Sequence, residues 1–176
     1  MSTANRLQIA TVGVARTRAL GRRLARFLRS GDVVLLQGPL GAGKTALAQG
    51  IGSGLRVEGP VNSPTFVLLA RHDPSDTGAT TPSLYHADLY RLTSPDEVAD
   101  LELAAQASSG VLLVEWPERG LEALPADHLL VVIELVEGAA NERRLTFVAV
   151  GERYRRVLDG LAASGHVAQG GSARAR

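Results

Sequence analysis

The sequence contains no cysteine. This absence excludes disulfide bonds, thiolate metal sites and cysteine nucleophiles. No apolar run is long enough to cross a membrane, and the first thirty residues lack the apolar segment of a secretory signal. With 19 basic and 18 acidic residues the net charge is only +1, which excludes a global field that would drive the whole molecule onto nucleic acid or lipid. We therefore expect a cytoplasmic protein with no membrane partner.

Lysine is almost absent as well. The basic residues are 18 arginines and a single lysine, Lys44. Because the chain uses arginine everywhere else, Lys44 indicates a position that needs a compact ammonium group on a flexible stem rather than a planar guanidinium. Taken alone, the observation leaves chance retention of one surface lysine as an equal alternative.

Hydrophobic residues make up 45% of the 176 residues, enough for the core of one domain, expected over residues 1–163. Short apolar runs typical of buried strands alternate with segments of helical periodicity. The expected strands are 7–14, 33–37, 66–70, 84–89, 111–114, 128–136 and 143–150, and the expected helices are 16–28, 44–53, one beginning at Ser94, and 152–162. This order predicts an α/β sandwich around a mainly parallel sheet with antiparallel C-terminal strands. We expect an exposed loop over 72–83 and a disordered tail over 164–176.

A phosphate-binding motif, G-x-x-x-x-G-K-(S/T), lies between the expected strand 33–37 and helix 44–53. It consists of Gly38, Pro39, Leu40, Gly41, Ala42, Gly43, Lys44 and Thr45. The glycines let successive backbone N–H groups face phosphate oxygens, and the helix N-terminus adds partial positive charge. Lys44 is expected to reach the β- and γ-phosphates, and the Thr45 hydroxyl to bind Mg²⁺. The sequence therefore predicts a nucleoside triphosphate site in a three-layer sandwich of the P-loop NTPase type.

Two acidic residues follow expected strands and could organise the magnesium ion. Glu115 comes directly after strand 111–114, and Asp88 lies in strand 84–89. Both would lie at the carboxyl ends of strands, where open α/β sheets bind ligands. Each could also be a solvated edge carboxylate, an alternative that the sequence leaves open.

A missing motif excludes one class of nucleotide-binding protein, the Ras-type GTPases. A Ras-type GTPase reads guanine with Asn-Lys-x-Asp, which a chain with Lys44 as its only lysine does not contain. Two other classes stay open: a small-molecule kinase, with Arg153, Arg155 and Arg156 as candidate lid arginines, and a module that binds ATP without hydrolysing it.

Three further segments, together with the phosphate-binding motif, resemble a known family. They are Asn62-Ser63-Pro64-Thr65-Phe66, Tyr85-His86-Ala87-Asp88-Leu89-Tyr90-Arg91-Leu92 and Leu113-Val114-Glu115-Trp116-Pro117. Over roughly residues 10–150 the chain resembles the bacterial TsaE family, the ATPase component of the machinery that makes threonylcarbamoyladenosine beside the anticodon of tRNA. The resemblance implies an ATPase that uses ATP and Mg²⁺, is slow alone, and supports turnover of TsaD and TsaB. It also implies that the chain is not itself the transferase and meets tRNA through that complex.

The resemblance also assigns catalytic roles to single residues. Thr45 and Glu115 match the magnesium-binding positions, and Asp88 matches an acidic residue tied to catalysis. With Lys44 neutralising charge on the γ-phosphoryl group, the expected catalytic residues are Lys44, Asp88 and Glu115.

Three more residues are implied to lie beside the nucleotide. Thr65 matches a switch-like loop near the γ-phosphate, Trp116 matches a tryptophan next to the nucleotide, and Thr17, in a Thr-x-x-Leu-Gly element, matches a position near the base. The arginines on one face of helix 16–28 are a candidate tRNA contact, although a solvated face is the commoner meaning of such a run of charge.

Overall fold

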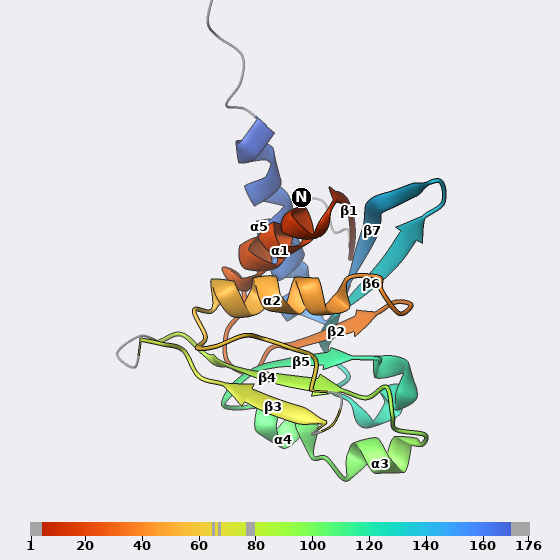
Figure 1. Ribbon diagram of the computed structural model, residues 1–176. Coiled ribbons are helices and arrows are strands. Elements are labelled where there is room, and N and C mark those ends of the chain that lie inside the picture. The colour runs from red at the N-terminus through yellow and green to blue at the C-terminus, as the bar shows by residue number, and fades with distance from the viewer. Residues whose placement is uncertain (1–4, 65, 67, 77–79, 170–176) are drawn as a thin grey trace, which may run out of the picture.

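A seven-stranded sheet runs through the part of the molecule that the computed structural model describes, residues 5–64, 66, 68–76 and 80–169. Its strands are β1 (Arg6–Val12), β2 (Val33–Gln37), β3 (Leu69–His72), β4 (Ser83–Asp88), β5 (Gly110–Glu115), β6 (His128–Val136) and β7 (Ala139–Val150). Their order across the sheet is β1-β7-β6-β2-β5-β4-β3, as Figure 1 shows.

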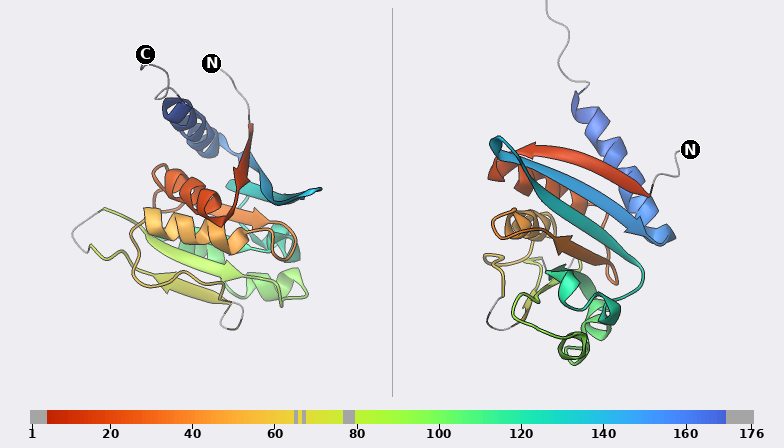
Figure 2. Two further views of the ribbon diagram at one scale, coloured as in Figure 1. Left: turned by 45° about the horizontal axis from the view of Figure 1, so that its top comes forward. Right: turned by 90° about the vertical axis from the view of Figure 1, so that its right-hand side faces the viewer.

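The middle of the sheet is parallel and both of its ends are antiparallel. Strands β6, β2, β5 and β4 pair in parallel. The β6–β7 hairpin confirms the expected antiparallel C-terminal strands, and β1 extends it on β7 to give a long twisted ribbon (Figure 2). β3 adds an antiparallel edge on β4. The predicted α/β sandwich is confirmed, with antiparallel pairing at two edges rather than one.

Helices cover both faces of this sheet. They are α1 (Val14–Ala25), α2 (Lys44–Gly54), α3 (Pro95–Ala99), α4 (Leu103–Ala107) and α5 (Glu152–Gln169), with 3₁₀ turns η1 (Pro117–Arg119) and η2 (Leu121–Ala123). Successive residues of β2 belong to different cores: Val34 and Leu36 pack with α1, α2 and α5, and Val33 and Leu35 pack with residues near α3 and α4. Figure 1 shows α1 and α2 on one side of the central strands and α3 and α4 on the other. A strand buried on both faces explains the unbroken apolar run.

Helices α1 and α2 pack so closely that two glycines are required at their contact. A Cβ atom on Gly21 would collide with the Leu47 carbonyl oxygen, and one on Gly50 would collide with the Arg18 carbonyl oxygen. The colliding atoms belong to the backbone, which cannot swing away. Gly21, the glycine of the Thr-x-x-Leu-Gly element, therefore allows α1 to pack closely against α2, the helix that follows the phosphate-binding motif.

The structure corrects several expected boundaries. The strand expected at 66–70 is β3, Leu69–His72, because Leu68 takes a left-handed φ of 63° and its N–H bonds to the Pro64 carbonyl oxygen, a turn that keeps Phe66 out of the sheet. Strand β7 begins at Ala139 rather than at Arg143, since the hairpin turns tightly around Gly138.

The C-terminal helix also differs from the expected boundary. It continues to Gln169, whereas the sequence predicted an end near Ala162 and a tail from Ser164. The rest of that predicted tail, residues 170–176, lies outside the described residues. Within the described part of the chain, no helix combines the length and apolar character needed to cross a membrane.

Candidate functional site

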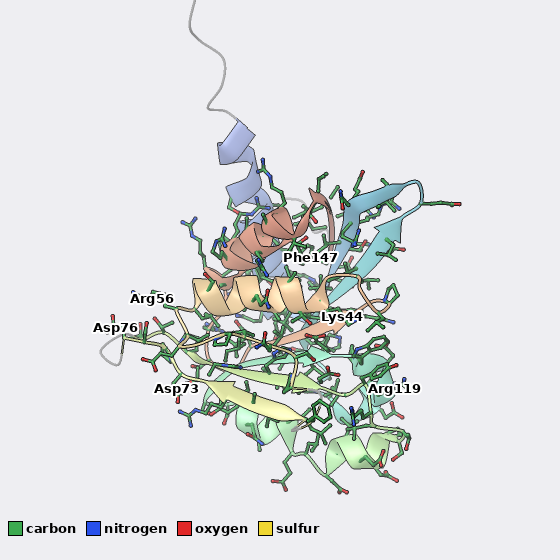
Figure 3. All side chains as sticks on the ribbon, viewed as in Figure 1. Lys44, Arg56, Asp73, Asp76, Arg119 and Phe147 are labelled. Carbon is green, nitrogen blue, oxygen red and sulfur yellow. The ribbon has the colours of Figure 1, made fainter. Side chains whose placement is uncertain are left out.

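The predicted catalytic residues meet where the parallel strands end. β2 runs into the phosphate-binding loop, residues 38–45, from which α2 begins at Lys44, and Glu115 is paired in register with Leu36 of β2. Asp88 is paired in register with Glu115. Figures 1 and 3 show the start of α2, with Lys44, at the edge toward which β2, β4 and β5 point. The topology therefore brings together residues that are far apart in the sequence.

The phosphate-binding loop needs glycine for its backbone shape. Gly41 has a φ of 77° and Gly43 a φ of 107°, a region that side chains disfavour. Nothing lies within 4 Å of a Cβ atom built on Gly41, so its requirement is conformational rather than steric. Gly43 is also the N-cap of α2, which directs the unpaired N–H groups of the first helical turn toward the loop. The positive φ angles at both glycines are what the motif predicts for a loop that binds phosphate.

The Lys44 side chain folds back onto the first residues of this loop. Its Nζ atom donates to the carbonyl oxygens of Gly38, at 2.7 Å, and Pro39, at 3.0 Å, and it stands 3.9 Å from the centre of the Trp116 ring. Burial lowers the pKa of Lys44, while the negative charges of Glu115, Glu118 and Asp88 act to raise it. The single lysine is thus a buried ammonium in contact with two loop carbonyls and an aromatic face.

Thr45 and Glu115 supply the oxygen atoms that a magnesium ion would need. The Thr45 hydroxyl donates to Oε1 of Glu115 at 3.2 Å, and Nε2 of His86 lies 3.0 Å from the same oxygen. Among the described residues, no group of three or more acidic or histidine side chains could hold a metal ion by itself. This donor set fits Mg²⁺, which in nucleotide sites takes one or two protein oxygens and completes its shell with phosphate and water.

Asp88 ties the surrounding loops together. Its side chain is 4% exposed, accepts a hydrogen bond from the Ser63 hydroxyl, and accepts a second one from the Tyr90 N–H at 2.9 Å. Asp88 therefore anchors both the segment that precedes Thr65 and the turn after β4. Thr65 itself lies outside the described residues, so its role near the γ-phosphate stays a prediction.

These side chains line a cavity of about 390 Å³. Its lining comprises Leu40, Gly41, Gly43, Lys44, Thr45, Ser63, Asp88, Tyr90, Glu115 and Trp116. Trp116 has a left-handed φ of 61° and packs against Tyr90 with 4.9 Å between ring centres. The cavity contains the predicted catalytic and magnesium residues together, and Trp116 beside them.

Thr17 lies on the other side of the loop. It lines a smaller cavity of about 90 Å³ with Gly43 and Arg143, and its buried hydroxyl is 2.9 Å from the Thr11 hydroxyl. The structure therefore does not place Thr17 in the cavity with Lys44, although both cavities share the loop glycines. The role of Thr17 near the base stays a prediction.

Sequence reasoning missed Arg143 and the contact made by His86. Arg143, on β7, donates from Nε to the Ala42 carbonyl oxygen at 3.1 Å and from Nη1 to the Ala140 carbonyl oxygen at 2.7 Å. Nothing near Arg143 in the sequence signals a contact with a loop about a hundred residues earlier. His86 stood in the family-like block, but only the parallel pairing of β4 with β5 shows that it reaches Glu115.

The candidate lid arginines on α5 lie elsewhere. Arg153 pairs with the buried Asp32, at 2.6 Å between Nη2 and Oδ2, just before β2 begins. Arg155 and Arg156 pair with Glu152 on their own helix. Because β2 carries the phosphate-binding loop at its other end, these arginines do not serve as a lid over the cavity.

Three kinds of comparison relate the chain to known proteins. Residues 12–145 match the family model described as "Threonylcarbamoyl adenosine biosynthesis protein TsaE". A Streptomyces coelicolor protein named tRNA threonylcarbamoyladenosine biosynthesis protein TsaE is 46% identical over 140 residues, covering 78% of this chain and 93% of the relative. The Bacillus subtilis protein of that name is 39% identical over 152 residues, covering 86% and 90%. The crystal structure of Bacillus subtilis YdiB matches with a TM-score of 0.74 and 33% identity, over 91% of this chain and 96% of that one.

Proposed function

This chain belongs to the TsaE family, and on that ground we propose that it binds ATP with magnesium and hydrolyses it in support of tRNA threonylcarbamoyladenosine synthesis. The observation that carries the ATPase proposal is the meeting of Lys44, Thr45 and Glu115 at the end of β2, around one cavity. A glycine-shaped loop, a buried ammonium and two oxygen donors are what a magnesium-bound triphosphate requires.

The proposed mechanism uses positioning and charge and forms no covalent intermediate. The loop amides and the start of α2 bind the phosphate chain, and the Lys44 ammonium neutralises the negative charge that develops as the γ-phosphoryl group is transferred to water. Thr45 and Glu115 would hold the magnesium ion, whose contribution when bound is to shield the phosphate oxygens. Asp88 keeps the segment around Ser63 and the turn at Tyr90 in place over the cavity.

We further propose that the partners are TsaD and TsaB, with tRNA reached through their complex, and that the isolated chain hydrolyses ATP slowly. The names of the relatives support the pathway; the choice of partner proteins rests on the family resemblance. A cytoplasmic location follows from the same proposal, because tRNA is modified there.

Reconstitution tests the proposal against the two other classes. Phosphate release would be measured for the chain alone and with TsaD, TsaB and tRNA, and modified tRNA would be measured in the same reactions. We expect a slow rate alone, a faster rate in the complex, and modification that stops without ATP. Nucleotide binding with no turnover in either reaction would leave only a binding module. ADP formation that needs a metabolite acceptor would instead indicate a kinase.

A further inference from the structure

His86 is a buried polar side chain with an unusual environment. It lies in the middle of β4, paired in register with Ala70 of β3 and Leu113 of β5, and it is 0% exposed. Its neighbour on the same face two residues earlier, Leu84, belongs to the apolar core. Nδ1 of His86 is buried without a hydrogen-bond partner among the described residues. A buried polar atom left in this way is costly, so a role other than packing is needed to explain the histidine.

The other ring nitrogen contacts the candidate magnesium acid. Nε2 of His86 is 3.0 Å from Oε1 of Glu115, and Glu115 is itself only 2% exposed. An ionised carboxylate can only accept hydrogen bonds, so Nε2 carries the proton and donates. Since the Thr45 hydroxyl donates to the same oxygen at 3.2 Å, Oε1 receives two donors.

We propose that His86 is a positioning residue for Glu115: by donating to Oε1, it fixes the orientation of the carboxylate that would hold the nucleotide-bound magnesium. This inference rests on the proposed function. Partners behind a metal ligand set its orientation, and their loss typically lowers metal affinity about ten- to a hundredfold. Without the His86 donor the Glu115 carboxylate keeps only the hydrogen bond from Thr45, its orientation is less well fixed, and magnesium then adds less to nucleotide binding.

The test separates the gain in affinity that magnesium gives from the affinity for the nucleotide itself. The affinity for the non-hydrolysable analogue adenylyl imidodiphosphate would be measured by calorimetry with magnesium and, separately, with EDTA. The variants are His86→Leu, which removes both ring nitrogens, and His86→Gln, whose amide can still donate to Glu115. His128→Leu is the matched control, because His128 is also buried but contacts the Pro125 carbonyl oxygen at the start of β6.

We expect His86→Leu to bind the analogue in EDTA as the parent protein does and to lose about tenfold or more of the gain in affinity that magnesium gives. His86→Gln should keep most of that gain, and His128→Leu should keep all of it. If His86→Leu fails to fold, His86→Asn, whose shorter side chain does not reach Glu115, is expected to show the same loss.

Two outcomes would overturn the inference alone. In one, His86→Leu or His86→Asn keeps the full gain in affinity that magnesium gives to the parent protein. In the other, the variant loses affinity equally with and without magnesium, which indicates a purely structural role. A parent protein that binds no analogue under either condition would overturn the proposed function itself, so the two failures are distinguishable.

Discussion

The Arg143 side chain donates to the carbonyl oxygen of Ala42, with 3.1 Å between Nε and the oxygen. Ala42 lies inside the phosphate-binding loop and is fully buried, whereas Arg143 lies on β7. The same guanidinium donates to Ala140 and Glu142 of the β6–β7 hairpin. The hairpin is thus bonded directly to the loop, and the conformation of the loop depends on the antiparallel end of the sheet.

Replacing Arg143 by alanine is therefore expected to weaken ATP binding. Each lost hydrogen bond contributes roughly 0.5–1.5 kcal/mol, so we expect a loss of about two- to tenfold in affinity, measured by calorimetry with magnesium present. Arg144→Ala is the matched control, because Arg144 is the adjacent, exposed residue. Equal effects of the two substitutions would show that general charge, not the contact with Ala42, is responsible.

Lys44→Ala and Lys44→Arg are both expected to abolish support of tRNA modification and to reduce ATP hydrolysis by roughly a hundredfold. Arginine should fail as well, because the ammonium fits between two loop carbonyls and the Trp116 ring, where a planar guanidinium does not. Phosphate release in the reconstituted system measures this effect. Hydrolysis at the parental rate in Lys44→Ala would refute the catalytic role of Lys44.

Tyr154 is expected to give the protein an alkaline limit of stability. Burial raises the pKa of Tyr154 above its ordinary value of 10.0, and the Val33 N–H, which donates to the hydroxyl oxygen at 2.7 Å, acts in the opposite direction. Because the folded-state pKa lies above the unfolded-state value, folding favours the neutral phenol. The contribution of the neutral Tyr154 phenol to the free energy of unfolding is fully present below the unfolded-state pKa. It is lost as the pH rises through the folded-state pKa.

Thermal unfolding measured between about pH 8 and 11 tests this effect, because that range spans the ordinary tyrosine pKa of about 10. Tyr154→Phe should lower stability by about 1–3 kcal/mol near neutral pH, because it leaves the buried Val33 N–H without an acceptor. The variant should also lose less stability than the parent at alkaline pH. Identical pH profiles for the two proteins would contradict the assignment to Tyr154.

Gly21→Ala is expected to destabilise the fold by about 1–3 kcal/mol, because the added methyl group would meet the backbone of α2. Gly165→Ala is the control: Gly165 also lies in a helix, but the atoms nearest to a Cβ atom there belong to the flexible Arg23 side chain, at 3.7 Å or more. The control should be neutral or stabilising by up to about 1 kcal/mol. Chemical denaturation of both variants measures the difference, and similar values for the two would rule out the close contact between α1 and α2.

Features set by neighbouring residues could be predicted without the structure. The bounds of β2 and the start of α2 were predicted because an unbroken apolar run, two left-handed glycines and a helix start follow one another along the chain. The helix start at Ser94 was predicted for the same reason, and the structure shows a capping box there: the hydroxyl of Ser94 and the carboxylate of Glu97 bond to each other's backbone N–H groups within one turn. Local chemistry is enough in these cases.

Which distant residues contact the site depends on how the strands are arranged in the fold. Arg143 reaches Ala42 because β7 joins the sheet beyond β6, and His86 reaches Glu115 because β4 pairs with β5 in one register. A shift of one residue in that register would turn His86 to the opposite face of the sheet. Strand order and register are set by burial summed over the whole sheet, so no short stretch of sequence contains them.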